Sequence, residues 1–260
     1  MPIGNVNDLT FRAKELLTNI KCIFCEDRRQ TQELFKRAGI KTQARLICLN
    51  EHQEIHSQSY LENIQNQGQD AAFVTDAGTP SISDPGSMIV SHAHKMNIKV
   101  SPLPGPSALS TFLSVIGAPS MPVHFVGFLP KKKQAKIDFF SKEIDSDRLL
   151  VFFESPHRVR DTLLVLRDLN ISFPIYMARE MTKTFEEIKV INKEDLDDPS
   201  WLTEKGEFVL GIVQNRTQSE NWMEAAIELQ DKLGLKSTSL FVQKYFNVPK
   251  NTVYKYLLNK

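Results

Sequence analysis

The sequence predicts an α/β protein made of two α/β domains and a short C-terminal helical region. Over the first hundred residues, short apolar strands alternate with amphipathic helices, which is typical of a parallel sheet covered on both faces. Strand-like segments then follow one another with few helices between them, which favours a mixed sheet. Three helical patterns close the chain. We expect segments at residues 1–118, 119–217 and 218–260, with a Pro-rich break at residues 117–122 marking the first boundary.

Each element follows from apolar spacing and from the residues that interrupt it. In the first segment we expect helices at residues 8–20, 29–38, 53–67, 85–96 and 106–116, and strands at 21–25, 45–49, 71–75 and 98–101. In the second we expect strands at 124–129, 149–153, 175–179, 185–191 and 207–214, and one helix at 156–169. In the third we expect helices at 221–233, 237–246 and 249–258.

Composition excludes several classes of protein. Hydrophobic residues make up 41% and charged residues 24%, which argues against a disordered chain. No apolar run approaches the roughly 18 residues of a membrane span, and residues 1–5 do not resemble a signal peptide. Three cysteines favour a reducing cytoplasm. Cys22 and Cys25 match a C-x-x-C pattern, but on a strand they point to opposite faces, so we expect core residues rather than a redox pair.

The net charge of +1 is an average over two unlike regions. Residues 234–260 contain five lysines and no Asp or Glu, so this region carries +5 and the rest of the chain −4. Its apolar residues can form the core of a small helix-turn-helix-like bundle. We expect that core to contain Leu240, Phe241, Tyr245, Val248, Val253, Tyr256 and Leu257. A basic tail of this kind is suited to RNA, although a helical cap or a dimer contact would also explain it.

Two loops combine features of a ligand site. Residues 76–86 and 102–108 each follow a predicted strand and precede a predicted helix, and both are rich in Gly and Pro. Open α/β sheets bind ligands at this edge. Asp84 and Pro85 are suited to begin a helix, whose first N–H groups would be open to an anion such as a carboxylate. No G-x-G-x-x-G or P-loop pattern occurs, which argues against a dinucleotide dehydrogenase or a P-loop NTPase.

An ordered set of short motifs then gives a specific resemblance. The motifs are Pro2-Ile3-Gly4-Asn5, Glu26-Asp27-Arg28, Asp76-Ala77-Gly78-Thr79-Pro80, Ser83-Asp84-Pro85-Gly86, Pro104-Gly105-Pro106-Ser107-Ala108, Phe128-Leu129-Pro130, Phe153-Glu154-Ser155-Pro156-His157-Arg158, Ala178-Arg179-Glu180-Met181-Thr182-Lys183 and Lys205-Gly206-Glu207-Phe208. Together they resemble the tetrapyrrole methylase superfamily and, within it, the cytidine 2′-O-methyltransferases of 16S ribosomal RNA in the small subunit. The resemblance covers essentially the whole chain.

The resemblance implies two α/β domains with S-adenosylmethionine in the cleft between them, a homodimer, and 16S ribosomal RNA of the small ribosomal subunit as partner. The cofactor residues implied are Pro2, Gly4, Asp76, Ala77, Gly78, Pro80, Ser83, Pro104, Gly105, Ser107, Ala108 and Ala178. The chain departs from the family pattern in two places. The strand that usually precedes Pro2 is expected to be missing, and Arg28 stands where the family usually has Thr.

Methyl transfer to a ribose hydroxyl requires a group that positions the hydroxyl and removes its proton. The candidates for this group are Asp27, Glu180 and His157, together with Glu26 and Glu154. The spacing of these residues does not single one out. For His157 a role at a helix start is favoured over catalysis, and an internal ion pair is the structural alternative for Arg179 and Glu180. The expected RNA contacts are Arg28, Arg158, Lys131, Lys132, Lys183, Lys250 and Lys255. We expect no metal, because His52 and His56 lack a third ligand.

Two other functions remain open at this point. A methyltransferase of a tetrapyrrole or another small substrate would use the same fold. A nucleic-acid-binding protein without catalytic activity is the alternative from a different class, and the missing first strand is its support. The basic tail and the motifs around Glu26 and Arg158 favour the RNA enzyme.

Overall fold

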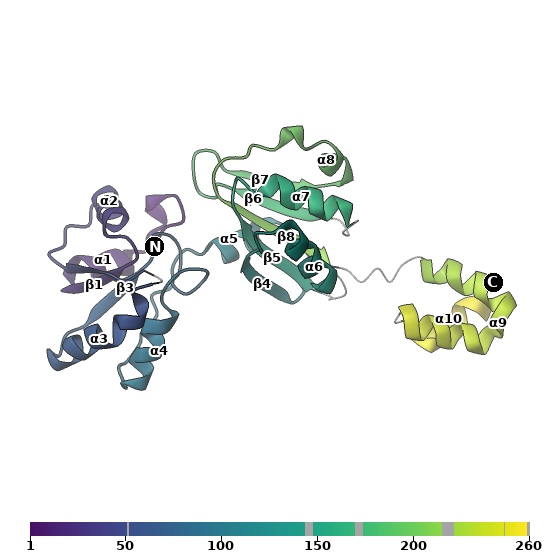
Figure 1. Ribbon diagram of the computed structural model, residues 1–260, viewed down its shortest axis with the longest axis horizontal. Helices are drawn as coiled ribbons and strands as arrows, with labels where there is room; N and C mark the ends of the chain where they lie inside the picture. Colours follow the sequence, from purple (N-terminus) through teal and green to yellow (C-terminus); the bar gives the residue numbers. More distant parts are fainter. Residues whose placement is uncertain (51, 144–147, 170–173, 215–220, 247, 259–260) are drawn as a thin grey trace.

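The computed structural model describes residues 1–50, 52–143, 148–169, 174–214, 221–246 and 248–258 (Figure 1). It contains a three-stranded sheet, a five-stranded sheet and a C-terminal helical unit. The mixed α/β architecture confirms the predicted fold class. Within these ranges, no helix is long and apolar enough to cross a membrane.

The first sheet is parallel, as its alternation of short strands and helices predicts. Its strands β1 (Cys22–Cys25), β2 (Arg45–Cys48) and β3 (Ala71–Val74) lie in the order β2-β1-β3. The helices that accompany them are α1 (Phe11–Asn19), α2 (Arg28–Ala38), α3 (Ser57–Asn66) and α4 (Ser87–Lys95), with short 3-10 turns at Val6–Asp8 and Glu54–His56.

Strand β1 is buried on both faces, which confirms the interpretation of its two cysteines. Cys22 packs in one apolar cluster with Phe24, and Cys25 packs in another with Ile23. Both thiols are free, and burial raises the pKa of each. Cys22 and Cys25 are therefore core residues rather than a redox pair.

The strand expected at residues 98–101 is wrong. This segment has no regular structure, and in the described ranges β3 pairs with β1 alone. A strand needs a neighbour for its backbone hydrogen bonds. The apolar pattern of residues 98–101 is typical of a strand, but these residues pair with no strand in the described part of the chain.

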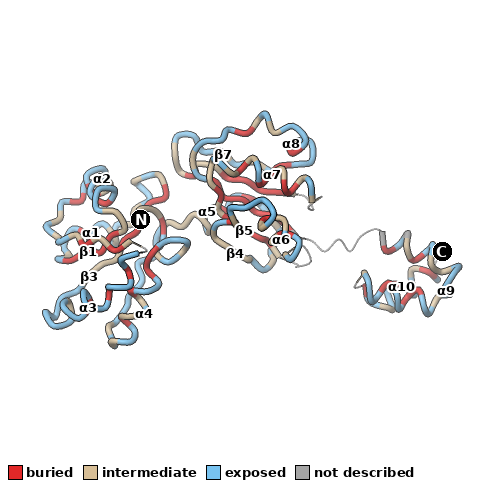
Figure 2. The backbone as a smooth tube through the Cα atoms, viewed as in Figure 1, coloured by how far each residue is buried: buried red, intermediate tan, exposed pale blue. Residues whose placement is uncertain are grey.

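The second sheet is mixed, as predicted, in the order β4-β5-β8-β6-β7. Strands β4 (Val123–Phe128) and β5 (Arg148–Glu154) are parallel, and the other neighbours are antiparallel. The remaining strands are β6 (Ile175–Arg179), β7 (Glu187–Ile191) and β8 (Phe208–Gln214). Its largest apolar cluster lies against α6 (Lys133–Glu143) and α7 (Val159–Asp168), and α8 (Lys193–Asp197) and a 3-10 turn at Pro199–Trp201 complete this part. Figure 2 shows the buried strands at its centre.

Helix α6 was not among the expected elements. Its first residue is Lys133. The helix buries Phe140 on the sheet and also buries Lys136, whose ammonium group meets the carboxylate of Glu154 at 3.3 Å. A lysine on the buried face weakens the apolar periodicity from which a helix is predicted.

Helix α5 (Ala108–Val115) joins the two parts of the chain (Figure 1). Its Phe112 is fully buried in a cluster with Leu149 and Val151 of the second sheet. The boundary expected at residue 118 stays a prediction, but α5 packs on the sheet that follows that boundary.

The C-terminal unit has its own small core. Helix α9 (Asn221–Phe246) breaks at Gly234, where φ is 72°, and α10 (Lys250–Leu258) packs against it. Its buried apolar residues are Trp222, Ala226, Val242, Val248, Val253 and Leu257. The expected core was partly wrong, because Leu240, Phe241 and Tyr245 are exposed. The turn residue Asn247 lies outside the described residues.

Candidate active site

Three loops that are far apart in the sequence touch one another at the edge of the first sheet. The hydroxyl of Thr79 donates to the carbonyl of Pro106 at 3.1 Å, and the amide of Gly78 donates to the carbonyl of Pro2 at 3.4 Å. A methyl group on Gly78, whose φ is +69°, would lie 3.5 Å from Ile3. The expected convergence of residues 2–4, 76–80 and 104–108 is therefore present.

The middle loop also reaches the second sheet. At Gly127 of β4, a Cβ atom would lie 2.8 Å from the hydroxyl of Ser83. Ser81 and Ser83 both have positive φ, and the amide of Ser81 donates to the carbonyl of Pro85 at 3.1 Å. Non-glycine residues pay a steric cost for this conformation, which is frequent at functional sites.

The helix start expected at Asp84 and Pro85 is wrong, and so is its open anion site. Helix α4 begins at Ser87, and its N-cap is Gly86. The buried carboxylate of Glu54 accepts the amides of Gly86, Met88 and Ile89 at 2.9, 3.0 and 3.0 Å. A side chain of this chain thus already occupies the positive end of the helix.

Four carboxylates gather where β1 and β3 end, and we name Glu26, Asp27, Asp76 and Asp84 the carboxylate cluster. The amide of Asp76 donates to Glu26 at 3.3 Å, and the amide of Asp27 donates to Asp76 at 3.3 Å. Gln30 donates to the second oxygen of Asp76 at 2.8 Å. Parallel strands bring these side chains together because their carboxyl ends share one edge.

Crowding changes the acidity of two members of the cluster. Burial first, and then repulsion from Glu26, raises the pKa of Asp76 to about 6. Burial and repulsion from Glu26, Asp76 and Glu207 raise the pKa of Asp84 to about 6. Glu207 directly precedes β8 of the second sheet, so residues from both parts of the chain affect the pKa of Asp84. A carboxylate that titrates near neutral pH is suited to accept a proton.

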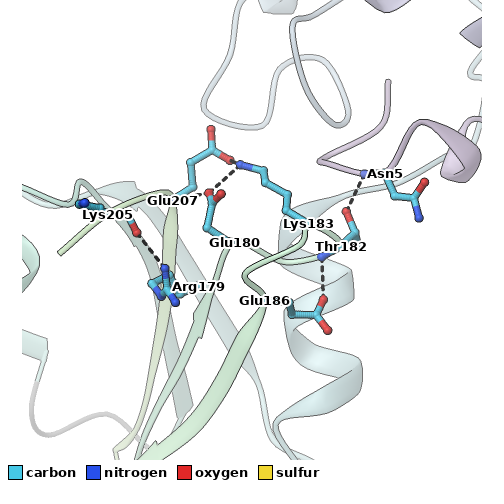
Figure 3. Close-up of polar contacts among 8 residues, drawn as sticks. All are labelled: Asn5, Arg179, Glu180, Thr182, Lys183, Glu186, Lys205 and Glu207. Carbon is cyan, nitrogen blue, oxygen red and sulfur yellow. Dashed lines mark hydrogen bonds and ion pairs between the residues drawn. The ribbon is translucent and has the colours of Figure 1, made fainter. Parts of the chain in front are cut away.

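The two sheets meet in a polar seam, which we define as residues 2–5 and 180–183 (Figure 3). The amide of Asn5 donates to the hydroxyl of Thr182 at 3.0 Å. A Cβ atom on Gly4 would lie 2.5 Å from Cγ of Lys183 and 2.6 Å from Oγ1 of Thr182. Ile3 is buried in the same apolar cluster as Met181. Only glycine allows this close approach of the two loops.

Glu180 and Lys183 are held in the seam by each other. The Lys183 ammonium lies 2.7 Å from Glu180 and 2.9 Å from Glu207, and the Glu207 amide donates to Glu180 at 3.0 Å (Figure 3). Burial acts to raise the pKa of Glu180, but the bonds from Lys183 and Glu207 outweigh it and the pKa is lowered. These contacts favour a structural role for both residues over their expected roles as base and RNA contact.

The other predicted catalytic residues have different environments. The carboxylate of Asp27 caps α2 by accepting the amides of Arg29 and Gln30 at 2.6 and 3.1 Å. His157 is exposed in the turn before α7, whose N-cap is Arg158, so the predicted helix start at Ser155 and Pro156 is wrong by three residues. Asp27 also acts on the carboxylate cluster, because its amide hydrogen bond lowers the pKa of Asp76 while the charge of its carboxylate raises it.

The predicted RNA contacts are not gathered at one place. Lys131 and Lys132 are exposed after β4, and Lys250 and Lys255 lie on α10. Arg158 instead pairs with the buried carboxylate of Glu154 at 2.8 Å and donates to the carbonyl of Leu129 at 2.8 Å. Arg28 is exposed at the start of α2. Of the predicted cofactor residues, Ala178 is fully buried on β6, while the others lie on the three loops, on the stretch that reaches β4, or at the start of α5.

Sequence reasoning missed Asp76 as an acid–base candidate and Glu54 as the cap of α4. The signal for Asp76 was present, because acidic residues follow both β1 and β3. Glu54 gave no such signal, because its partners lie more than thirty residues away in the sequence. Among the described residues, no group of three or more His, Cys, Asp or Glu side chains could hold a metal ion.

Comparisons with known proteins agree with this architecture. The sequence pattern of the tetrapyrrole (corrin/porphyrin) methylases matches residues 1–197. The chain belongs to that family. A protein of Escherichia coli O157:H7 named ribosomal RNA small subunit methyltransferase I is 38% identical over 269 aligned residues, which cover 100% of this chain and 93% of that protein. Relatives down to 32% identity bear the same name.

Solved structures share the fold at low sequence identity. Diphthine synthase superposes with a TM-score of 0.63 at 11% identity, over 82% of this chain and 86% of that one. A uroporphyrin-III C-methyl transferase from Thermus thermophilus complexed with S-adenyl homocysteine superposes with a TM-score of 0.53 at 14% identity, over 80% and 92% of the two chains.

Proposed function

We propose that this chain transfers a methyl group from S-adenosylmethionine to the ribose 2′-oxygen of a cytidine in 16S ribosomal RNA of the small subunit. The similarity to the small-subunit RNA methyltransferases, which extends over the whole chain, carries this proposal. The carboxylate cluster beside three converging loops supports it, because it combines a proton acceptor with a ligand site at one sheet edge.

The residues present fit the proposed cofactor. A sulfonium is a cation, and the cluster supplies negative charge to face it. A Cβ atom on Gly105 would meet nothing within 4 Å, so the loop has open space in front of its backbone. The loop residues Asp76, Ala77, Gly78, Pro104 and Gly105 would hold the cofactor. When bound, the cofactor supplies the electrophilic methyl group.

The reaction needs the chain to orient the ribose hydroxyl and to take its proton. Asp76 is the strongest candidate for the base, since it ionises near pH 6 and is oriented by the Asp27 amide and Gln30. Glu180, Asp27 and His157 stay candidates. Because Asp27 caps α2 and Glu180 is paired with the ammonium group of Lys183, we expect these two residues to orient the site.

The function is tested by incubating the protein with methyl-labelled cofactor and small subunits from cells that lack the protein. We expect label in the RNA at a ribose oxygen. Label in a free tetrapyrrole and none in the subunits would favour the small-substrate alternative. If calorimetry detects no binding of the cofactor, the alternative of a nucleic-acid-binding protein without catalytic activity is favoured.

We further propose that the protein works in the cytoplasm as a homodimer. The resemblance supports the dimer, and the presence of ribosomal RNA as substrate supports the compartment. Analytical ultracentrifugation of the purified chain tests the dimer, and a single species at the mass of one chain would contradict it.

A further inference from the structure

A basic groove lies on the first domain, separate from the three loops. It has a volume of about 640 Å³ and runs between α2 and residues 40–46. The buried side chains of Phe35 and Ile40 line it, and so do the exposed side chains of four cations, Arg28, Lys36, Lys41 and Arg45. No carboxylate is among its lining residues.

Among the described residues, none of these four cations has an acidic partner. The ion pairs of the described residues include none of them. Carboxylates are scarce nearby, because residues 28–46 contain six Lys or Arg and only one Glu. Arg28 donates one hydrogen bond, at 2.9 Å, to the carbonyl of Leu46. A guanidinium has five N–H donors, so this bond leaves Arg28 able to bind a phosphate as well. Four unpaired cations around one concave surface attract a polyanion.

The groove begins beside the carboxylate cluster. Arg28 directly follows Asp27, whose amide bonds to Asp76. With a rise of about 1.5 Å per residue, Lys36 lies ~12 Å further along the axis of α2. Cations are thus distributed from the edge of the proposed reaction site outward, which suits a chain of phosphates more than a single small anion.

We propose that this groove binds the phosphate backbone of the substrate RNA next to the nucleotide that is methylated. The inference rests on the proposed function and adds a substrate-binding surface to it. Guanidinium and ammonium groups pair with phosphates without reading sequence, so the groove contributes affinity and orientation, and base recognition lies elsewhere.

The test compares two variants with the same change in charge. The groove variant is Lys36→Gln/Lys41→Gln/Arg45→Gln. The control variant is Lys95→Gln/Lys142→Gln/Lys193→Gln, which changes three exposed lysines outside the groove. All six side chains are exposed, so both variants should fold. RNA affinity is measured over a series of salt concentrations, with small-subunit RNA from cells that lack the protein, and cofactor affinity is measured by calorimetry.

We expect the groove variant to bind the RNA roughly tenfold or more weakly and to lower the slope of log affinity against log salt by about 2, since each phosphate contact on a single strand contributes about 0.7. The control variant should retain the wild-type slope, and cofactor affinity should be unchanged in both. Equal RNA binding by the two variants would overturn the proposal. A changed sedimentation coefficient with unchanged RNA affinity would also overturn it, because a second copy of the chain would then occupy the groove.

The wild-type protein separates this proposal from the function on which it rests. If it transfers no methyl group to small subunits, the proposed function fails and the groove proposal falls with it. If it methylates them and the groove variant binds like the control, only the groove proposal fails.

Discussion

Asp76 receives two hydrogen bonds and lies near three other carboxylates, so its ionisation is coupled to its surroundings. Its pKa, and that of Asp84, lie near 6 rather than near 4. Above pH 6 both groups carry negative charge, and below it both become neutral. The acidity of the site is therefore set by neighbours that the fold brings together.

This ionisation predicts a pH dependence of cofactor binding. Protonation of Asp76 and Asp84 removes two of the negative charges proposed to face the sulfonium, so affinity should fall as pH decreases through about 6. Calorimetric titrations between pH 5 and 8 check this, and S-adenosylhomocysteine, which has no sulfonium charge, is the control. The same pH dependence for both ligands would contradict the expected role of the charge.

The capping of α4 by Glu54 gives a second prediction at the scale of single residues. Replacing it in Glu54→Ala leaves three amides at the start of α4 without their acceptor, so we expect the free energy of unfolding to fall by about 1–3 kcal/mol. Denaturant titration measures this. The control Glu62→Ala removes an exposed carboxylate from α3 and should change stability by less than about 0.5 kcal/mol. Equal effects in the two variants would show that the cap contributes little.

At the scale of the elements, the local sequence pattern predicts the strands and helices whose bounds depend on neighbouring residues. It does not predict bounds that depend on residues far away in the sequence. The strands β1, β2, β3 and β6 follow their expected ranges to within one residue because apolar runs and glycines define them. Residues 98–101 have a similar apolar pattern, but among the described residues they pair with no strand. The start of α4 is capped by Glu54, which no local pattern links to Gly86.

The seam between the sheets gives a prediction at this scale. In Gly4→Ala, the new methyl group would overlap Lys183 and Thr182 and come within 2.9 Å of the Met181 carbonyl oxygen, so the two loops must separate. We expect cofactor affinity to fall at least tenfold, because residues 2–4 also border the cofactor loop. Calorimetry measures this affinity. Unchanged binding would show that the seam tolerates displacement.

At the scale of the whole molecule, net charge conceals how charge is distributed. The average of +1 combines a basic tail, a basic groove on the first domain and a cluster of carboxylates at the sheet edge. Composition revealed the tail, since five lysines occur there without an acid. It did not reveal the groove, because α2 and residues 40–46 form it only after folding. The motifs indicated which loops converge, whereas pairings within the seam required the structure.

The tail gives a prediction for RNA binding. In Lys236→Gln/Lys244→Gln/Lys250→Gln/Lys255→Gln, we expect the core of the C-terminal unit to stay intact, because none of the four lysines is among its buried residues. We expect weaker RNA binding and a lower salt slope, with unchanged cofactor affinity. Binding titrations at several salt concentrations measure both. An unchanged salt slope would favour a role for the unit as a helical cap or a dimer contact.

The central claim is that this chain methylates a ribose in small-subunit RNA, and mapping of 2′-O-methyl groups tests it most directly. Small-subunit RNA from cells with and without the protein is compared nucleotide by nucleotide, and the purified protein is then added back. We predict that one cytidine loses its 2′-O-methyl group when the protein is absent and regains it on addition of protein and S-adenosylmethionine. Identical methylation maps in the two RNAs would contradict the claim.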